Sequence, residues 1–181
     1  RIGMGGGQLL QELIGGEDDA VKDAWSRHFE ELKPEVRALP GAADLLRAVA
    51  AAGARVLLGS STEEKDLDVL LDALDAGDVI ELVTSSGDVD EAKPSPEVFA
   101  TALAKAEVAA DRAIVVGDTV WDVRAATAAG LDCIGLLTGG IDRRALEDEG
   151  AVAVYRDAEE LTAQLDASPI GQLIRRSRRT G

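Results

Sequence analysis

Short apolar runs alternate with longer segments rich in Ala, Leu and Glu along most of the chain. The apolar runs fall at 54–60, 78–86, 112–118, 132–140 and 151–157. Three of them are nearly continuous apolar stretches, which is typical of strands covered on both faces. The segments between them predict helices at 42–52, 63–75, 96–106, 121–129, 142–149 and 158–166. This alternation predicts an α/β fold with a parallel sheet flanked by helices.

The two ends of the chain depart from this alternation. Near the start, "GGQLLQELIGG" and "DDAVKDAWSRHFEELKP" predict amphipathic helices with no strand between them, so we expect a helical subdomain at 1–40. Pro40 and Gly41 mark its link to an α/β core at 41–166. The last segment, 167–181, contains "IRRSRRTG" and is expected to be a basic, flexible tail without a function of its own.

The amino-acid composition and the net charge limit the kinds of partner that we expect for this protein. The apolar and charged contents, 46% and 29%, are those of an ordinary soluble globular protein, and no apolar run approaches the length of a membrane span. The net charge of −15 argues against nucleic acid and against an anionic membrane as partners. A single cysteine, Cys133, excludes an internal disulfide and any multi-cysteine metal site, which fits a cytoplasmic protein best.

Two aspartates lie where the run at 112–118 passes into the following helix. In an open parallel sheet, ligands bind beyond the carboxyl ends of the strands, so strand-final polar residues are the first candidates for chemistry. Asp118 would lie in the turn and Asp122 in the first helical turn, where two carboxylates could hold Mg²⁺ together with waters and phosphate oxygens. The alternative is structural: Thr119 caps the helix and Asp122 completes a capping box.

Two other strand ends carry polar candidates. Lys93, before Pro94, would be held on a stiff loop, where its ammonium could neutralise a phosphoryl group or could simply be a solvated surface charge. Ser60, next to Ser61, could donate its hydroxyl to a phosphoryl oxygen or could cap the helix that follows.

The order of these candidate residues along the chain is more informative than any one of them alone. Ser60, then Lys93 before a proline, then Gly117-Asp118 with Asp122, each at the end of a strand, resembles the haloacid dehalogenase (HAD) superfamily. The resemblance is to the branch with an inserted helical cap, which includes phosphoglycolate phosphatase-like and β-phosphoglucomutase-like enzymes, and it covers about residues 1–166. It implies a Rossmann-like core with a partial helical cap, Mg²⁺ as cofactor and a small phosphorylated metabolite as substrate.

The resemblance also implies roles for individual residues. Lys93 is the charge-neutralising lysine, Asp118 a direct Mg²⁺ ligand, and Asp122 either a second ligand or a group that orients the site. The implied phosphate- and substrate-binding set consists of Ser60, Ser61, Lys93, Arg1, Gly5 and Gly6. The glycines near the start have an alternative interpretation as a flexible connection.

One expected motif is missing. The superfamily uses D-x-D-G-T at the end of its first strand, where the first aspartate attacks phosphorus, and this sequence contains no such string. "DVD" at 88–90 lacks the Gly-Thr, and "DLD" at 66–68 lies in a predicted helix. We therefore expect the first strand and the start of the cap to lie before Arg1, and the chain as written to be inactive.

The resemblance implies that the missing strand lies at the centre of the sheet, between the strands at 54–59 and 113–117. The structure should accordingly show a gap or a rearranged contact between these two strands.

Three other functions are alternatives to a Mg²⁺-dependent phosphatase. A phosphomutase of the β-phosphoglucomutase type would use the same residues. A non-catalytic binding or regulatory protein would have lost the first motif altogether. A phospho-receiver domain places its acidic residues before its lysine, whereas the order here is Ser, Lys, Asp. Substrate identity and the choice between monomer and homodimer are not determined by the sequence.

Overall fold

The computed structural model describes residues 6–16, 18–60, 62, 64–89, 91 and 93–180. Its strands are β1 (Val56–Gly59), β2 (Ile80–Thr84), β3 (Ile114–Gly117), β4 (Asp132–Leu136) and β5 (Ala153–Tyr155). Each lies inside one of the five predicted runs, because those runs also included the turn residues that leave the sheet. All strand pairs are parallel, so the predicted α/β class with a parallel sheet flanked by helices is confirmed.

Helices connect the strands as the pattern predicts. The six that follow the predicted segments are α3 (Ala42–Ala51), α4 (Glu64–Leu74), α5 (Glu97–Ala106), α6 (Val120–Ala128), α7 (Arg143–Asp148) and α8 (Ala158–Ala163). The helices near the start are α1 (Gly6–Ile14) and α2 (Asp19–Leu32). The carboxylate of Asp18 caps α2 by accepting hydrogen bonds from two backbone N–H groups in its first turn. None of the described helices is long and apolar enough to cross a membrane.

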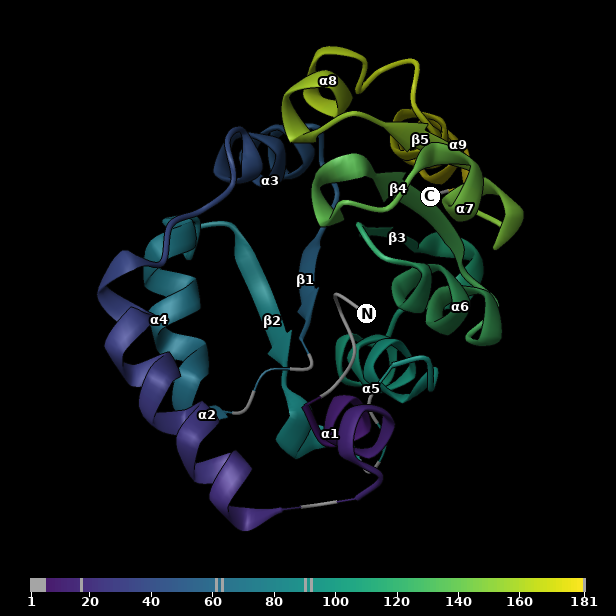
Figure 1. Cartoon of the computed structure of the whole chain (residues 1–181). Helices are drawn as coiled ribbons and strands as arrows, with labels where there is room; N and C mark the ends of the chain where they lie inside the picture. The colour runs from purple at the N-terminus through teal and green to yellow at the C-terminus, as the bar shows by residue number, and fades with distance from the viewer. Residues whose placement is uncertain are drawn as a thin grey trace.

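The strands form two sheets rather than one. β1 pairs with β2, while β3, β4 and β5 form a separate sheet in that order, and among the described residues no strand joins the two (Figure 1). The predicted break between the strands at 54–59 and 113–117 is therefore confirmed in the form of a gap. In the part of the chain that the structure describes, one edge of β1 and one edge of β3 have no strand beside them.

The buried core surrounds the three-stranded sheet on both faces. On one face, Val115, Cys133 and Val154 pack with Val123 of α6 and Leu146 of α7. On the other, Ile134 packs with side chains from three helices, α3, α8 and α9 (Pro169–Thr180): Leu45, Leu161 and Ile170. Neighbouring residues of β4 thus serve opposite faces, which explains why its sequence is apolar without alternation. Burial raises the pKa of the Cys133 thiol to about 12, so this cysteine is a core residue.

The chain end corrects one expectation. Residues 169–180 form α9 (Pro169–Thr180) instead of a flexible tail. Ile170 is 4% exposed, and the guanidinium of Arg178 donates a 2.7 Å hydrogen bond to the carbonyl of Ala52. The prediction of a tail rested on the four arginines. The helical spacing of Ile170, Leu173 and Ile174, which gives this helix an apolar face, indicates a packed helix instead.

Candidate active site

The turn that leaves β3 is fixed by a capping box. The side chain of Thr119 accepts a 3.3 Å hydrogen bond from the backbone N–H of Asp122. In return, one carboxylate oxygen of Asp122 (Oδ2) accepts from the backbone N–H of Thr119 at 3.1 Å and from its hydroxyl at 2.7 Å. Both residues are buried. Asp122 thus caps α6, and this role uses one of its two carboxylate oxygens.

The other oxygen of Asp122 is bound to Lys93. The ammonium of Lys93 lies 2.7 Å from Oδ1 of Asp122, and the two side chains are only 13% and 10% exposed. The same ammonium lies 5.8 Å from the centre of the Phe99 ring. Lys93 is therefore a fixed, mostly buried cation beside the carboxyl end of β3 and not a solvated surface charge.

Two glycines allow these close approaches. A Cβ atom on Gly117 would lie 2.4 Å from the Cβ of Asp122, and one on Gly139 would lie 2.3 Å from the backbone oxygen of Asp118. Either contact is far shorter than carbon and oxygen atoms tolerate, so the backbone of the turn can approach α6 and the loop after β4 only because side chains are absent there.

Asp118 has a different environment from Asp122. Its side chain is partly buried, and its one described side-chain partner is the hydroxyl of Thr138, which donates at 3.1 Å. Burial raises the pKa of the Asp118 carboxyl above its usual value, and the negative charge of Asp122 adds to this; Thr138 and Lys93 act in the opposite direction. A cation bound beside Asp118 would relieve this unfavourable burial of charge.

The donor set fits Mg²⁺ through a single direct carboxylate. No group of three or more His, Cys, Asp or Glu side chains suited to a metal occurs among the residues that the structure describes. Both oxygens of Asp122 already accept hydrogen bonds, whereas Asp118 has one described side-chain partner, so Asp118 is the carboxylate that could more readily serve a metal. Mg²⁺ retains several waters and commonly binds through one or two carboxylates with substrate phosphate oxygens, so Asp118 meets the minimum requirement.

The remaining predicted site residues are Ser60, Ser61, Arg1, Gly5 and Gly6. Ser60 follows β1 directly, and its hydroxyl accepts a 3.1 Å hydrogen bond from the backbone N–H of Thr62. Within the described residues it shares no hydrogen bond with Lys93, Asp118 or Asp122. Gly6 is the first residue of α1. Arg1, Gly5 and Ser61 lie outside the described residues.

The sequence analysis missed Thr138, which orients Asp118. Thr138 follows β4, so the rule that directs attention to polar residues at strand ends would have found it. Phe99 was missed as well, because a single aromatic residue in a helix gives no sign of contact with a lysine. The structure thus places Lys93, Asp118 and Asp122 in one cluster, shows the capping box of Thr119 and Asp122 that the sequence allowed, and adds Thr138 as a hydrogen-bonding partner of Asp118.

Comparison with known proteins places this cluster in context. A sequence model of haloacid dehalogenase-like hydrolases matches residues 1–136. Phosphoglycolate phosphatase from Rhodospirillum rubrum is 31% identical over 173 residues, which covers 88% of this chain and 71% of that protein. The crystal structure of a hydrolase from Pseudomonas syringae has a TM-score of 0.79 at 32% identity, covering 92% of this chain and 78% of that one. A CbbY mutant from Rhodobacter sphaeroides, in complex with xylulose-(1,5)bisphosphate, has a TM-score of 0.70 at 25% identity, covering 88% and 76%.

Proposed function

Since the chain belongs to the haloacid dehalogenase-like hydrolase family, we propose that it carries the metal- and phosphate-binding half of a Mg²⁺-dependent phosphatase site. The observation that carries this proposal is the buried pair of Lys93 and Asp122 beside the unfavourably buried carboxyl of Asp118. The substrate class that we propose is a small phosphorylated metabolite of the phosphoglycolate or sugar phosphate type. The relatives supply this class, since one is a phosphoglycolate phosphatase and another was crystallised with a sugar bisphosphate.

Each residue of the cluster has a defined task in this proposal. Asp118, oriented by Thr138, holds Mg²⁺, and the bound ion neutralises charge on the phosphoryl group. Lys93 presents its ammonium to the phosphoryl oxygens, and Asp122 keeps that ammonium in place while it also caps α6. Ser60 offers its hydroxyl from the end of β1. Asp122 acts through Lys93 and Thr119, so it is a positioning residue.

A covalent route through an aspartyl phosphate also needs an activated carboxylate nucleophile. The 181 residues contain no D-x-D-G-T string. Asp88, in the "DVD" string, is held by the backbone of Ser85 and by an ion pair with Lys105. Asp66 and Asp68 belong to α4. We therefore propose that these 181 residues bind Mg²⁺ and phosphate but do not turn over substrate by themselves.

The test uses the purified chain with Mg²⁺, by titration calorimetry, and with phosphoglycolate, by release of inorganic phosphate. We expect Mg²⁺ binding that Asp118→Ala abolishes and no phosphate release above the rate in buffer. Asp111→Ala is the matched control, because Asp111 is exposed near the opposite end of β3. Unchanged Mg²⁺ binding in Asp118→Ala would contradict the proposal that Asp118 holds the metal. Phosphate release that depends on Asp118 would support the site but contradict the proposed inactivity.

A phosphatase is preferred to a phosphomutase because the relative from Rhodospirillum rubrum, at 31% identity, is a phosphoglycolate phosphatase. No residue in the described structure distinguishes a water acceptor from a sugar acceptor.

A further inference from the structure

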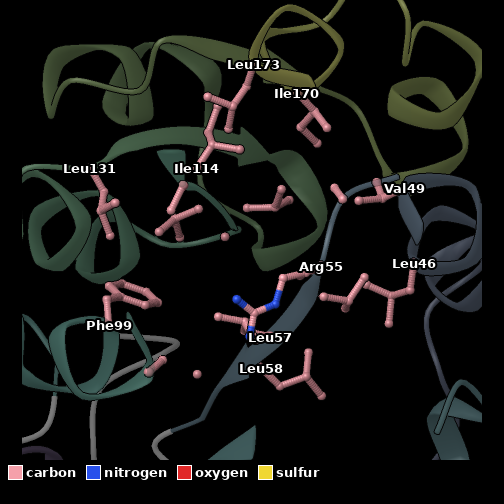
Figure 2. A pocket seen from close by; sticks show the side chains of 18 of the residues that line it. Leu46, Val49, Arg55, Leu57, Leu58, Phe99, Ile114, Leu131, Ile170 and Leu173 are labelled. Atoms are coloured by element: carbon pink, nitrogen blue, oxygen red, sulfur yellow. The ribbon is translucent and has the colours of Figure 1, made fainter. Parts of the chain in front are cut away.

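A cavity of about 1040 Å³ lies between β1 and β3, and side chains of the proposed site line part of it. Lys93, Asp118 and Asp122 belong to that part. Figure 2 shows the ring of Phe99, which extends from α5 toward the strand that carries Leu57. Among the described residues that line the cavity, Phe99 is the one aromatic side chain. Its ring is an apolar surface shared by β1 and the candidate site.

The ring packs against the bare backbone at the end of β1. A Cβ atom on Gly59 would lie 3.1 Å and 3.2 Å from two ring carbons of Phe99 and 3.4 Å from a methyl group of Val98. Carbon atoms in good contact are about 3.5–4.0 Å apart, so the ring occupies space that a side chain on Gly59 would need. Gly59 directly precedes Ser60, whose hydroxyl is proposed to meet the phosphoryl group. The ring is thus tied to the proposed phosphate-binding end of β1.

The same ring lies beside the ammonium of Lys93. The ammonium nitrogen is 5.8 Å from the ring centre and 2.7 Å from Oδ1 of Asp122. A cation within about 6 Å of an aromatic ring is attracted to its face, more strongly where water is excluded, and the Lys93 side chain is only 13% exposed. The ion pair alone lets the flexible four-carbon stem of the lysine approach Asp122 from several directions. The ring reduces this freedom, because it attracts the ammonium to one side.

Phe99 is itself held firmly by the core. Its neighbours Val98 and Ala102 in α5 are 1% and 5% exposed. The carbonyl of Val98 accepts a 3.4 Å hydrogen bond from the hydroxyl of Thr84, at the end of β2. Phe99 also packs against the buried cluster that includes Val123 of α6. Because α5 contacts β1 and β2 as well as α6, a change in the position of the ring would require movement of the core.

We propose that Phe99 is a positioning residue of this site, whose ring fixes the ammonium of Lys93 relative to Ser60 so that both can contact one phosphoryl group. The inference rests on the proposed function, because it assigns a further residue to that site. Its physical basis is the contact of the ring with Gly59 on one side and with Lys93 on the other. If Phe99 only filled the core, its replacement would lower stability without moving Lys93.

A second lysine beside a phenylalanine supplies a matched control. The ammonium of Lys33 lies 5.6 Å from the centre of the Phe29 ring and 2.8 Å from Oδ1 of Asp66. The Lys33 side chain is 17% exposed, close to the 13% of Lys93. Within the described residues, the partners of Lys33 are Phe29, Glu30 and Asp66, and none of them belongs to the proposed site. The two pairs have the same chemistry, but only one of them should affect phosphate.

The first measurement is the NMR spectrum of the chain labelled with ¹³C-lysine. The chain has five lysines, and Lys93→Arg and Lys33→Arg identify the two signals of interest. Ring currents shift protons over the face of an aromatic ring upfield, so we expect upfield Cε protons for both residues. Phe99→Leu should remove the displacement of Lys93 alone, and Phe99→Tyr should retain it. Phe29→Leu should remove the displacement of Lys33 alone.

The second measurement is the affinity for inorganic phosphate at saturating Mg²⁺, by titration calorimetry. We expect Phe99→Leu to weaken phosphate binding about three- to tenfold, the size of a partly desolvated cation–π contact. Phe99→Tyr should stay within about twofold of the unaltered chain, because an aromatic ring is retained. Phe29→Leu should also stay within about twofold, because the ring that it removes faces Lys33.

Gly59→Ala tests the contact without altering Phe99 or Lys93. The added methyl group should displace the ring, so the Lys93 signal should move and phosphate affinity should fall at least about twofold. Gly77→Ala is the control, because a Cβ there meets no atom within 4 Å. Circular dichroism establishes that each variant is folded. If Phe99→Leu fails to fold, Gly59→Ala and Phe99→Tyr decide the question.

The outcomes separate this inference from the proposed function. An unmoved Lys93 signal in Phe99→Leu and Gly59→Ala would overturn the inference, and so would a moved signal with unchanged phosphate affinity. In both cases the unaltered chain still binds phosphate, so the proposed function would stand. Absence of phosphate binding by the unaltered chain would contradict the proposed function and, with it, the role of Phe99.

Discussion

At the scale of single residues, Asp118 and Asp122 lie four positions apart in the sequence, but their carboxylates have different chemical environments. Asp122 accepts hydrogen bonds from Thr119 and an ion pair from Lys93, which together compensate for its burial. Asp118 loses water and gains a single hydroxyl partner, Thr138. Burial raises the pKa of the Asp118 carboxyl, and this is the property that a bound cation would use.

The first prediction follows from the raised pKa of Asp118. Because its folded pKa lies above the unfolded value, the ionised carboxyl opposes folding once the pH exceeds the unfolded pKa, and fully so above the folded pKa. Asp118→Asn should therefore raise Tm at pH 7 by about 1–3 °C, a small effect because solvent screens part of the charge. The gain should disappear near pH 3, where both states are protonated. Thermal unfolding followed by circular dichroism at both pH values measures this, and a lower Tm at pH 7 would contradict it.

The second prediction concerns Gly117. In Gly117→Ala the new methyl group would lie 2.4 Å from the Cβ of Asp122, so α6 must move away from the turn. We expect the free energy of unfolding to fall by about 1–3 kcal/mol, together with weaker Mg²⁺ binding. Urea denaturation gives the first quantity. The control is Gly77→Ala, where the added Cβ meets no atom within 4 Å and stability should stay within about 0.5 kcal/mol.

At the scale of elements, α9 has two faces with different tasks. Ile170 fills a core cluster against Leu45 and Leu161, while arginines occupy the other side and the last turn. Arginines in the last turn also interact favourably with the partial negative charge of a helix carboxyl end. The helix therefore covers one face of the three-stranded sheet, although its composition suggested a solvated end.

The third prediction distinguishes a packed helix from a loose tail. Ile170→Ala removes a side chain that is 4% exposed, so the free energy of unfolding should fall by about 2–4 kcal/mol. Arg179→Ala, at an exposed position of the same helix, should change it by less than about 0.5 kcal/mol. Urea denaturation compares the two variants. Equal stability of both would mean that α9 does not contribute to the core.

At the scale of the whole molecule, the two sheets differ in their support. β4 has a paired strand on each side, and three of its five residues are buried. β1 has one partner and borders the cavity on its other side, and Val56 is its one buried residue. A two-stranded sheet has little stability of its own, so β1 and β2 depend on α3 and α5 for their packing.

The fourth prediction is a difference in local stability. Amide hydrogens of Cys133 and Ile134 in β4 should exchange at least about tenfold more slowly than those of Leu57 and Gly59 in β1. Native-state hydrogen exchange measured residue by residue by NMR tests this. Uniform protection across both sheets would show that the cavity does not weaken β1.

The local pattern of the sequence determined the elements and their order. Apolar runs covered on both faces and amphipathic segments between them are properties of neighbouring residues, so five strands and six of the helices could be placed within a few positions. The positions of Lys93, Asp118 and Asp122 after predicted strands also indicated that they lie at one end of the sheet, because parallel strands have their carboxyl ends at the same edge. The break between β1 and β3 was predicted only through the resemblance to the HAD superfamily, whose first strand lies between these two.

Only the tertiary structure determined which partners these residues contact. Whether Asp122 serves a metal, a helix cap or a lysine depends on distances between segments remote in sequence, and the fold gives it the last two partners. The packing of α9 likewise depends on an apolar surface created by α3, α8 and β4, which no pattern within α9 records. Sequence periodicity fixes which face of an element is apolar, but only the assembled chain determines what that face meets and where a cavity remains.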